Sequence, residues 1–170
     1  VLVLALMHVG ARAGDIGTFV DETKCAECHR EETAAWRGSH HDLAMQEPSA
    51  RTVLGNFDDA SFTYGDVTTR FSRRGEKFVV TTDGVDGKPA AFDVSYVFGL
   101  TPLQQYLLPL PAGRLQALSV AWNAEQGKWY HLYPNEKVDF RDELHWTKPS
   151  QNWNFMCAEC HSTDVEKNYD

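Results

Sequence analysis

Four cysteines and two histidines stand in two copies of one short motif. Residues 25–29 and 157–161 both read C-A-E-C-H, and the chain has no other cysteine. The pattern C-x-x-C-H is typical of haem c attachment, because each cysteine at this spacing can form a thioether with one porphyrin vinyl group. The histidine that follows then reaches the iron, so two haem c groups are expected. The predicted thioether residues are Cys25, Cys28, Cys157 and Cys160. The predicted proximal iron ligands are His29 and His161.

A zinc site or a pair of local disulfides fits the four cysteines less well than haem does. A zinc site made of four cysteines would require the two pairs to converge across about 130 residues, and it gives no role to the histidines. Two local disulfides would each close a very short loop, which contributes little stability and is typical of labile, catalytic bonds. The histidine that follows both pairs therefore favours haem.

An iron that only transfers electrons also needs a second axial ligand. The only well-placed sulfur is that of Met45. Met156 directly precedes Cys157, so the attachment loop restrains it too strongly to reach the opposite haem face. The distal candidates among the histidines are His40, His41, His131 and His145.

Two short helices are expected after the first motif. Residues 31–37 contain good helix formers, and a glycine that can end the helix follows them. Residues 39–42 read S-H-H-D, a capping-box pattern that predicts the start of a second helix. This helix should end before Pro48. His41 and Met45 would then lie four residues apart on one face of it.

Between the motifs, apolar and polar residues alternate from residue 61 to residue 133, and turn residues interrupt the pattern. Alternation with a period of two predicts antiparallel strands in a small sheet or sandwich. The expected strands lie at residues 67–71, 78–82, 92–98, 103–110, 114–122 and 128–133. The fold class is therefore α+β, with short haem-binding helices and loops at both ends. The expected division is a first haem-binding segment at 14–60, a β-rich insertion at 61–135 and a second haem-binding segment at 136–170.

The aromatic residues of the insertion are assigned to its core rather than to a substrate platform. They are Trp122, Trp129, Tyr130 and Tyr133. His131 would point to the same side as Trp129, where a buried histidine and a haem ligand fit the pattern equally well. His145 lies in a looser stretch before the second motif, where a chain reversal could bring it over a haem.

The first thirteen residues have the pattern of a signal peptide. Residues 1–9 are apolar apart from His8, and Ala11-x-Ala13 is a small-x-small cleavage site. The apolar stretch is shorter than the about 20 residues that a spanning helix requires. The sequence therefore predicts export, to the bacterial periplasm or cell surface, without a transmembrane span. Because no methionine or basic region precedes Val1, sequence is expected to be missing at this end.

The segment around the first motif resembles that of known multihaem cytochromes. The matching residues are Cys25, Cys28, His29, Trp36, Ser39, His41 and Ala44. This pattern is similar to the C-x-x-C-H…W-x-x-S-x-H segment of cytochromes related to hydroxylamine oxidoreductase and cytochrome c nitrite reductase. The whole chain looks like the N-terminal part of exported multihaem cytochromes that carry tetratricopeptide repeats. Further matches lie at 98–99, 104–107, 113–116, 145–146, 153–154 and the second C-A-E-C-H.

The resemblance implies more than the motifs alone. In such proteins the histidine at the place of His41 commonly serves as a distal ligand, often of a haem other than the one attached just upstream. His41 is therefore preferred over His40. Such proteins usually continue with more C-x-x-C-H motifs, so the chain is expected to be cut after Asp170, and haems attached downstream would claim some of the histidines.

The composition of the chain and the histidines available as iron ligands favour an electron-transfer protein. The chain has 170 residues, 24 acidic and 16 basic side chains, and a pI near 5.3, which argues against nucleic-acid binding. It contains no phosphate loop, zinc-protease motif or serine elbow. The expected partners are redox proteins, including other cytochromes. The alternatives are part of a multihaem enzyme acting on a small nitrogen or sulfur compound, and a haem-containing module that binds a protein partner.

Overall fold

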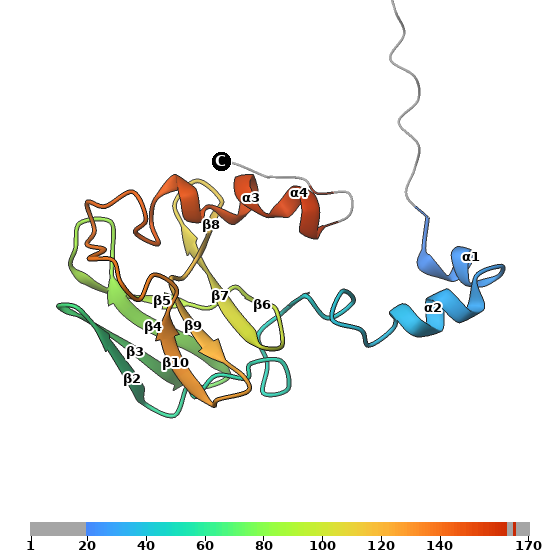
Figure 1. Cartoon of the computed structure of the whole chain (residues 1–170), viewed down its shortest axis with the longest axis horizontal. Coiled ribbons are helices and arrows are strands. Elements are labelled where there is room, and N and C mark those ends of the chain that lie inside the picture. The colour runs from blue at the N-terminus through green and yellow to red at the C-terminus, as the bar shows by residue number, and fades with distance from the viewer. Residues whose placement is uncertain (1–19, 163–164, 166–170) are drawn as a thin grey trace, which may run out of the picture.

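The structure, a computed structural model, describes residues 20–162 and residue 165 (Figure 1). The predicted signal peptide at residues 1–13 and its cleavage site lie outside this part of the chain. Among the described residues, no helix has both the length and the apolar character needed to cross a bilayer.

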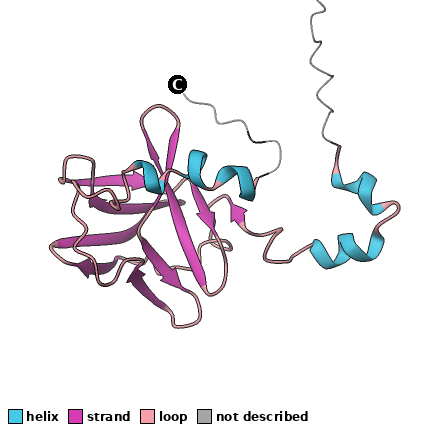
Figure 2. Ribbon diagram, turned by 45° about the horizontal axis from the view of Figure 1, so that its top comes forward, coloured by secondary structure: helices cyan, strands magenta, loops and turns pink. Residues whose placement is uncertain are grey.

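Two antiparallel sheets form the body of the protein, and short helices lie at both ends of the chain, which confirms the α+β prediction (Figure 2). One sheet has four strands in sequence order: β2 (Ala60–Tyr64), β3 (Val67–Arg74), β4 (Lys77–Asp83) and β5 (Pro89–Asp93). The other sheet has six. Its path runs through β1 (Met45–Gln46), β6 (Tyr96–Phe98), β7 (Leu103–Leu110), β9 (Val120–Asn123) and β10 (Lys128–His131), and β8 (Arg114–Ala117) also pairs with β7.

The main core lies between the two sheets, as in a sandwich. Alternate residues of β7 point into it, so Tyr106 and Leu108 are fully buried there. Phe57 occupies the centre, with its ring edge-on to Phe71 at 5.4 Å and to Trp129 at 5.7 Å between centroids. The predicted core residues Trp129 and Trp122 lie in or against this cluster. Tyr130 and Tyr133 are half-buried instead.

The C-terminal helices lie on the opposite face of the six-stranded sheet and cover part of it. These are a 3-10 helix η1 (Pro149–Gln151), followed by α3 (Trp153–Met156) and α4 (Ala158–His161). Leu107 of β7 points to this side and packs with Ala117, Trp153 and Ala158, all of them buried. The protein therefore has three layers, with the six-stranded sheet in the middle. This arrangement explains why residues 106–108 are all apolar or aromatic.

Two predicted strands are each divided in the structure. The strand expected at 92–98 is wrong as a single element, because β5 belongs to the four-stranded sheet and β6 to the six-stranded one. The chain crosses between them at Val94, whose N–H bonds to Phe78, and Ser95, whose N–H bonds to Leu107. The strand expected at 114–122 is interrupted between β8 and β9, where the carbonyl of Ser119 accepts from the N–H of Leu132.

The N-terminal helix pair consists of α1 (Glu22–Ala26) and α2 (Arg30–Trp36), and it stands beside the sheets (Figure 1). The helix predicted at 31–37 is therefore confirmed within a residue. The second predicted helix is wrong. The Oγ of Ser39 accepts from the N–H of Asp42 at 3.3 Å, so the capping contact forms, but it closes a turn only. Strand pairing of β1 with β6 then extends the chain, so His41 and Met45 share no helix face.

Buried amide side chains hold the C-terminal segment against the sheet. Gln116 of β8 donates from Nε2 to the carbonyls of Trp146 at 2.8 Å and Lys148 at 2.9 Å. Its Oε1 accepts from the amide of Asn152 at 2.7 Å. Within α3, the side chain of Asn154 accepts from the N–H of Leu115 at 2.8 Å. These bonds fix the position of α3, and the second C-A-E-C-H motif follows it directly.

We predict that Gln116→Leu destabilises the protein strongly. The substitution keeps the volume but leaves the carbonyl of Trp146 without its hydrogen-bond partner in a buried site, at about 1–3 kcal/mol. It also removes one bond each from the carbonyl of Lys148, which still accepts from the N–H of Gln151, and from the amide of Asn152, which still donates to the carbonyl of Leu115. The free energy of unfolding, measured by denaturant titration, should fall by at least about 2 kcal/mol. The matched control is Gln105→Leu, because Gln105 makes one longer bond, 3.3 Å to the carbonyl of Leu118. Equal losses in the two variants would contradict the role assigned to Gln116.

Candidate haem attachment sites

The first attachment motif, residues 25–29, forms one helical turn. The N–H groups of Cys28 and His29 both bond to the carbonyl of Cys25, at 3.2 and 2.9 Å. Residues separated by three and four positions lie on one face of such a turn. Cys25 therefore shares a face with Cys28 and with His29, and Cys25 and His29 line one hollow. All three side chains are exposed, and both cysteines are free.

The second attachment motif, residues 157–161, has the same hydrogen-bond pattern. The N–H groups of Cys160 and His161 bond to the carbonyl of Cys157, at 3.2 and 3.1 Å. Its surroundings differ, however, because Ala158 is fully buried against the six-stranded sheet and Cys157 is half-buried. Cys160 and His161 are exposed. The ring of His161 lies edge-on to Phe98, with 4.9 Å between centroids.

A shallow hollow borders the first motif on the N-terminal helix pair. Its lining combines Cys25 and His29 with Trp36, whose side chain is 45% exposed. The carboxylate of Glu22, also in the lining, bonds to the guanidinium of Arg37 at 2.9 Å and ties α1 to the end of α2. A porphyrin held here would have an exposed tryptophan beside it, but little of the protein around it.

A larger apolar groove borders the second motif. Phe155 and Met156, which precede Cys157, are 67% and 64% exposed and line it together with Arg114. On the other side of the motif, Phe98 belongs to the half-buried residues that pack on the cluster around Leu107. The second motif therefore has apolar surface on both sides.

The distal candidates His40 and His41 lie together in the exposed turn that precedes β1. Three residues after His41, the carbonyl of Ala44 accepts from the N–H of Gly99 at 2.6 Å. Met45 then pairs with Phe98 across β1 and β6. The structure thus joins the chain just after His41 to the strand that carries the aromatic neighbour of His161.

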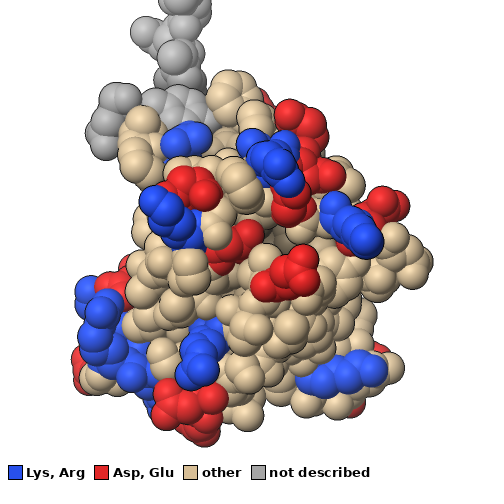
Figure 3. Space-filling view, turned by 90° about the vertical axis from the view of Figure 1, so that its left-hand side faces the viewer, with Lys and Arg blue, Asp and Glu red and all other residues tan. Residues whose placement is uncertain are grey.

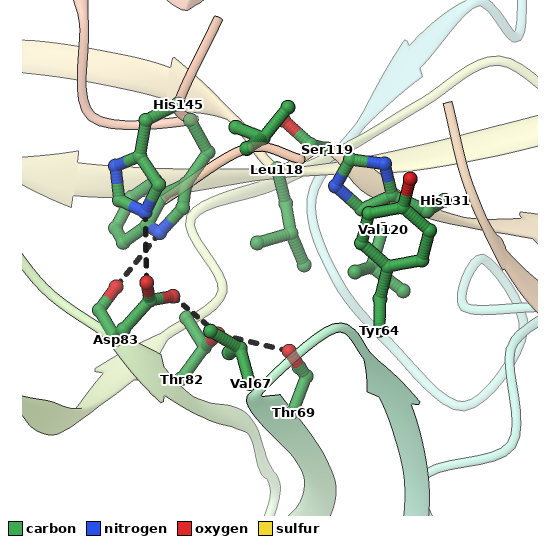
Figure 4. A pocket seen from close by; sticks show the side chains of 12 residues that line it. Tyr64, Val67, Thr69, Thr82, Asp83, Leu118, Ser119, Val120, His131 and His145 are labelled. Carbon is green, nitrogen blue, oxygen red and sulfur yellow. Dashed lines mark hydrogen bonds and ion pairs between the residues drawn. The ribbon is translucent and has the colours of Figure 1, made fainter. Parts of the chain in front are cut away.

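His145 and His131 lie inside the β-rich body, around a small cavity of about 30 Å³ (Figure 4). Both ring nitrogens of His145 have partners, Thr147 Oγ1 at 2.8 Å and Asp83 Oδ2 at 3.1 Å. His131 accepts from the N–H of Tyr133 through Nδ1 at 3.1 Å, and its ring stacks on that of Tyr64. Burial lowers the pKa of His131, which favours the neutral ring. In this arrangement both histidines serve the packing of the body.

Several residues that contact the predicted site residues belong to no sequence motif. Phe98 contacts the predicted ligand His161, and Asp83 holds His145 from 62 positions away. Among the amides that fix the second motif, Gln116 has apolar neighbours on both sides in the sequence, and this is a signal because a buried amide requires partners. Within residues 20–162 and 165, no three His, Cys, Asp or Glu side chains are grouped to hold a metal ion. The two cysteine pairs are free thiols rather than disulfides.

We predict that Cys157 is alkylated more slowly than Cys25 in the haem-free protein. Burial, with a smaller contribution from Cys160, raises the pKa of the Cys157 thiol, so less of it is thiolate near pH 8. Cys25 is the internal control, because it is the first cysteine of an identical motif and is exposed. Brief iodoacetamide labelling and peptide mass spectrometry measure both rates. The Cys157 rate should continue to rise at higher pH, and equal rates at pH 8 would contradict the prediction.

The comparison with known families agrees with the first attachment motif. Residues 24–60 match the family model described as cytochrome c554 and c-prime. The matched segment contains Cys25, Cys28, His29 and His41 and ends where β2 begins. No curated protein and no solved structure matches the chain. The match to residues 24–60 supports a relationship to the c-type cytochromes, in which haem is bound covalently.

Proposed function

We propose that this chain is a multihaem c-type cytochrome that transfers electrons through two covalently attached haems. The observation that carries the proposal is the identical turn at residues 25–29 and 157–161. One turn stands on an exposed helix pair and the other is packed on a sheet, so the shared geometry follows from the motif itself. Each turn places two free thiols and an imidazole within one helical turn of backbone. This donor set fits a porphyrin with two vinyl groups and one iron.

The roles of the residues follow from this arrangement. Cys25 and Cys28 hold one porphyrin, and His29 provides the proximal ligand of its iron. Cys157, Cys160 and His161 have the same roles at the second attachment motif. When bound, haem supplies one-electron exchange between ferric and ferrous iron. The protein sets the surroundings of each iron through ligands, burial and hydrogen bonds.

We propose His41 as a distal ligand, in preference to its weaker neighbour His40. Both rings are exposed, and their turn needs no disruption of the core for either ring to bind iron. His131 and His145 are weaker candidates. For His145 to bind iron it would have to give up a bond to Asp83 or Thr147 in a buried site, which costs free energy. Six-coordinate irons suit an electron relay rather than catalysis, because no position is open to a substrate.

Location and partners follow from the same proposal. The signal-peptide pattern at residues 1–13 favours export to the periplasm or the cell surface, and c-type cytochromes are typically exported. The partners would be other redox proteins. Acidic and basic side chains both occur across the face shown in Figure 3, and several basic side chains gather at its lower left. We propose that the chain is divided into haem-binding segments at 14–60 and 136–170 on either side of the insertion at 61–135.

The decisive experiment is to express the exported chain in bacteria that have haem c maturation machinery. We predict two covalent haems, seen as added mass and as haem staining after denaturation. Cys25→Ala with Cys28→Ala should leave one haem, and Cys157→Ala with Cys160→Ala should leave the other. Carbon monoxide should not change the reduced spectrum, because each iron has two protein ligands. Absence of covalent haem would refute the proposal, and a strong carbon monoxide shift would favour the enzyme alternative.

We predict that His41→Ala converts one of the two haems from low spin to a form that binds carbon monoxide. The reason is that the substitution removes a distal ligand while both attachment motifs stay intact. Absorption spectra of the oxidised and reduced protein measure the change. His40→Ala is the matched control, since His40 is the adjacent residue in the same exposed turn, and it should keep both haems low-spin. An unchanged spectrum in His41→Ala would remove His41 from the ligands.

A further inference from the structure

The six-stranded sheet carries an apolar surface that the C-terminal helices cover only in part. Residues paired across antiparallel strands point to the same face. Tyr96 pairs with Leu107, and Leu107 with Ala117, so these three side chains form one row. Buried Ala158 and Trp153 pack with Leu107 and Ala117 of this row.

The next row on the same face is less well covered. Phe98 lies two residues after Tyr96, so it points the same way, and it pairs with Met45 on one side and Gln105 on the other. Tyr96, Phe98 and Met45 are half-buried, whereas Leu107 is fully buried. We call these three half-buried residues the apolar sheet end.

The apolar sheet end lies beside the second attachment motif. Cys157 packs on the same cluster as its three residues. The ring of His161 meets Phe98 edge-on at 4.9 Å, and Figure 1 shows α4 lying over the side of the sheet where β6 runs. The partly buried first cysteine and the proximal histidine thus both adjoin this surface.

We propose that the apolar sheet end, Met45, Tyr96 and Phe98, is the surface on which the haem attached at Cys157 and Cys160 packs. This inference rests on the proposed function, because it requires a haem at this motif. Phe155 and Met156 offer a competing apolar surface on the other side. The sheet end is favoured because it contacts His161, the residue that fixes the position of the iron.

The two haems would then differ in exposure and in reduction potential. The second haem lies against an apolar surface, which disfavours the extra positive charge of ferric iron and raises its potential. The first haem, on the exposed helix pair, lacks this cover. Electrons that enter at the first haem would therefore move favourably to the second.

Potentiometric titration of single-haem proteins tests the placement. Cys25→Ala with Cys28→Ala isolates the second haem, and in this protein Phe98→Ala should lower the midpoint potential by exposing haem to water. In the protein that keeps only the first haem, Phe98→Ala should cause no shift. Phe155→Ala is the matched control, because it removes the same ring from the other side of the motif and should leave the second potential unchanged.

A second variant separates a direct effect on the haem potential from loss of folding. Met45 lies in a strand of two residues at the edge of its sheet, so Met45→Ser should keep the fold, as checked by circular dichroism, and should also lower the second potential. A shift with Phe155→Ala, or no shift with Phe98→Ala and Met45→Ser, would overturn the placement alone. Absence of haem mass at Cys157 and Cys160 in the unmodified chain would overturn the proposed function together with it.

Discussion

The buried amide of Gln116 is the constraint on which the second half of the structure depends. It joins β8 to the segment before α3 through two carbonyls and through Asn152. An amide placed among apolar strands is costly unless every partner is present, so the segment has one favourable position. That position brings Trp153 and Ala158 onto the sheet, and Cys157 and His161 follow from it. A polar contact inside the core thus determines where the second attachment motif stands.

The β-rich body and the N-terminal helix pair follow different physical rules. In the body, Phe57 and Tyr106 lie in a dense aromatic core, and burial raises the pKa of Tyr106, which keeps its hydroxyl protonated to donate to Gln104. In the helix pair no residue of α1 or α2 is buried, and the ion pair of Glu22 with Arg37 is exposed. Exposed ion pairs contribute little stability. The helix pair therefore relies on local capping, as at Asp21, more than on packing.

The sequence allowed the α+β class and most strands to be predicted, because alternation and turn glycines are local signals. The predictions that were wrong failed because contacts between distant parts of the chain outweighed the local signals. The capping pattern at residues 39–42 is present in the structure, but pairing of Met45 with Phe98, 53 positions away, prevents the helix. At the proposed sites, spacing alone predicted the cysteines and the histidines next to them. The contact of His161 with Phe98 and the bond of His145 to Asp83 join distant parts of the chain, and no local pattern encodes them.

Strand β1, which forms in place of the predicted second helix, affects the proposed electron path. A second helix after α2 would have placed His41 and Met45 on one helix face. The extended backbone instead ties Ala44 to Gly99 and Met45 to Phe98. Only a few residues separate His41 from this pairing. The side chain of His41 is therefore held near the sheet edge and near the second attachment motif. A short strand, rather than a helix, is therefore the element that links the surroundings of the two proposed haems.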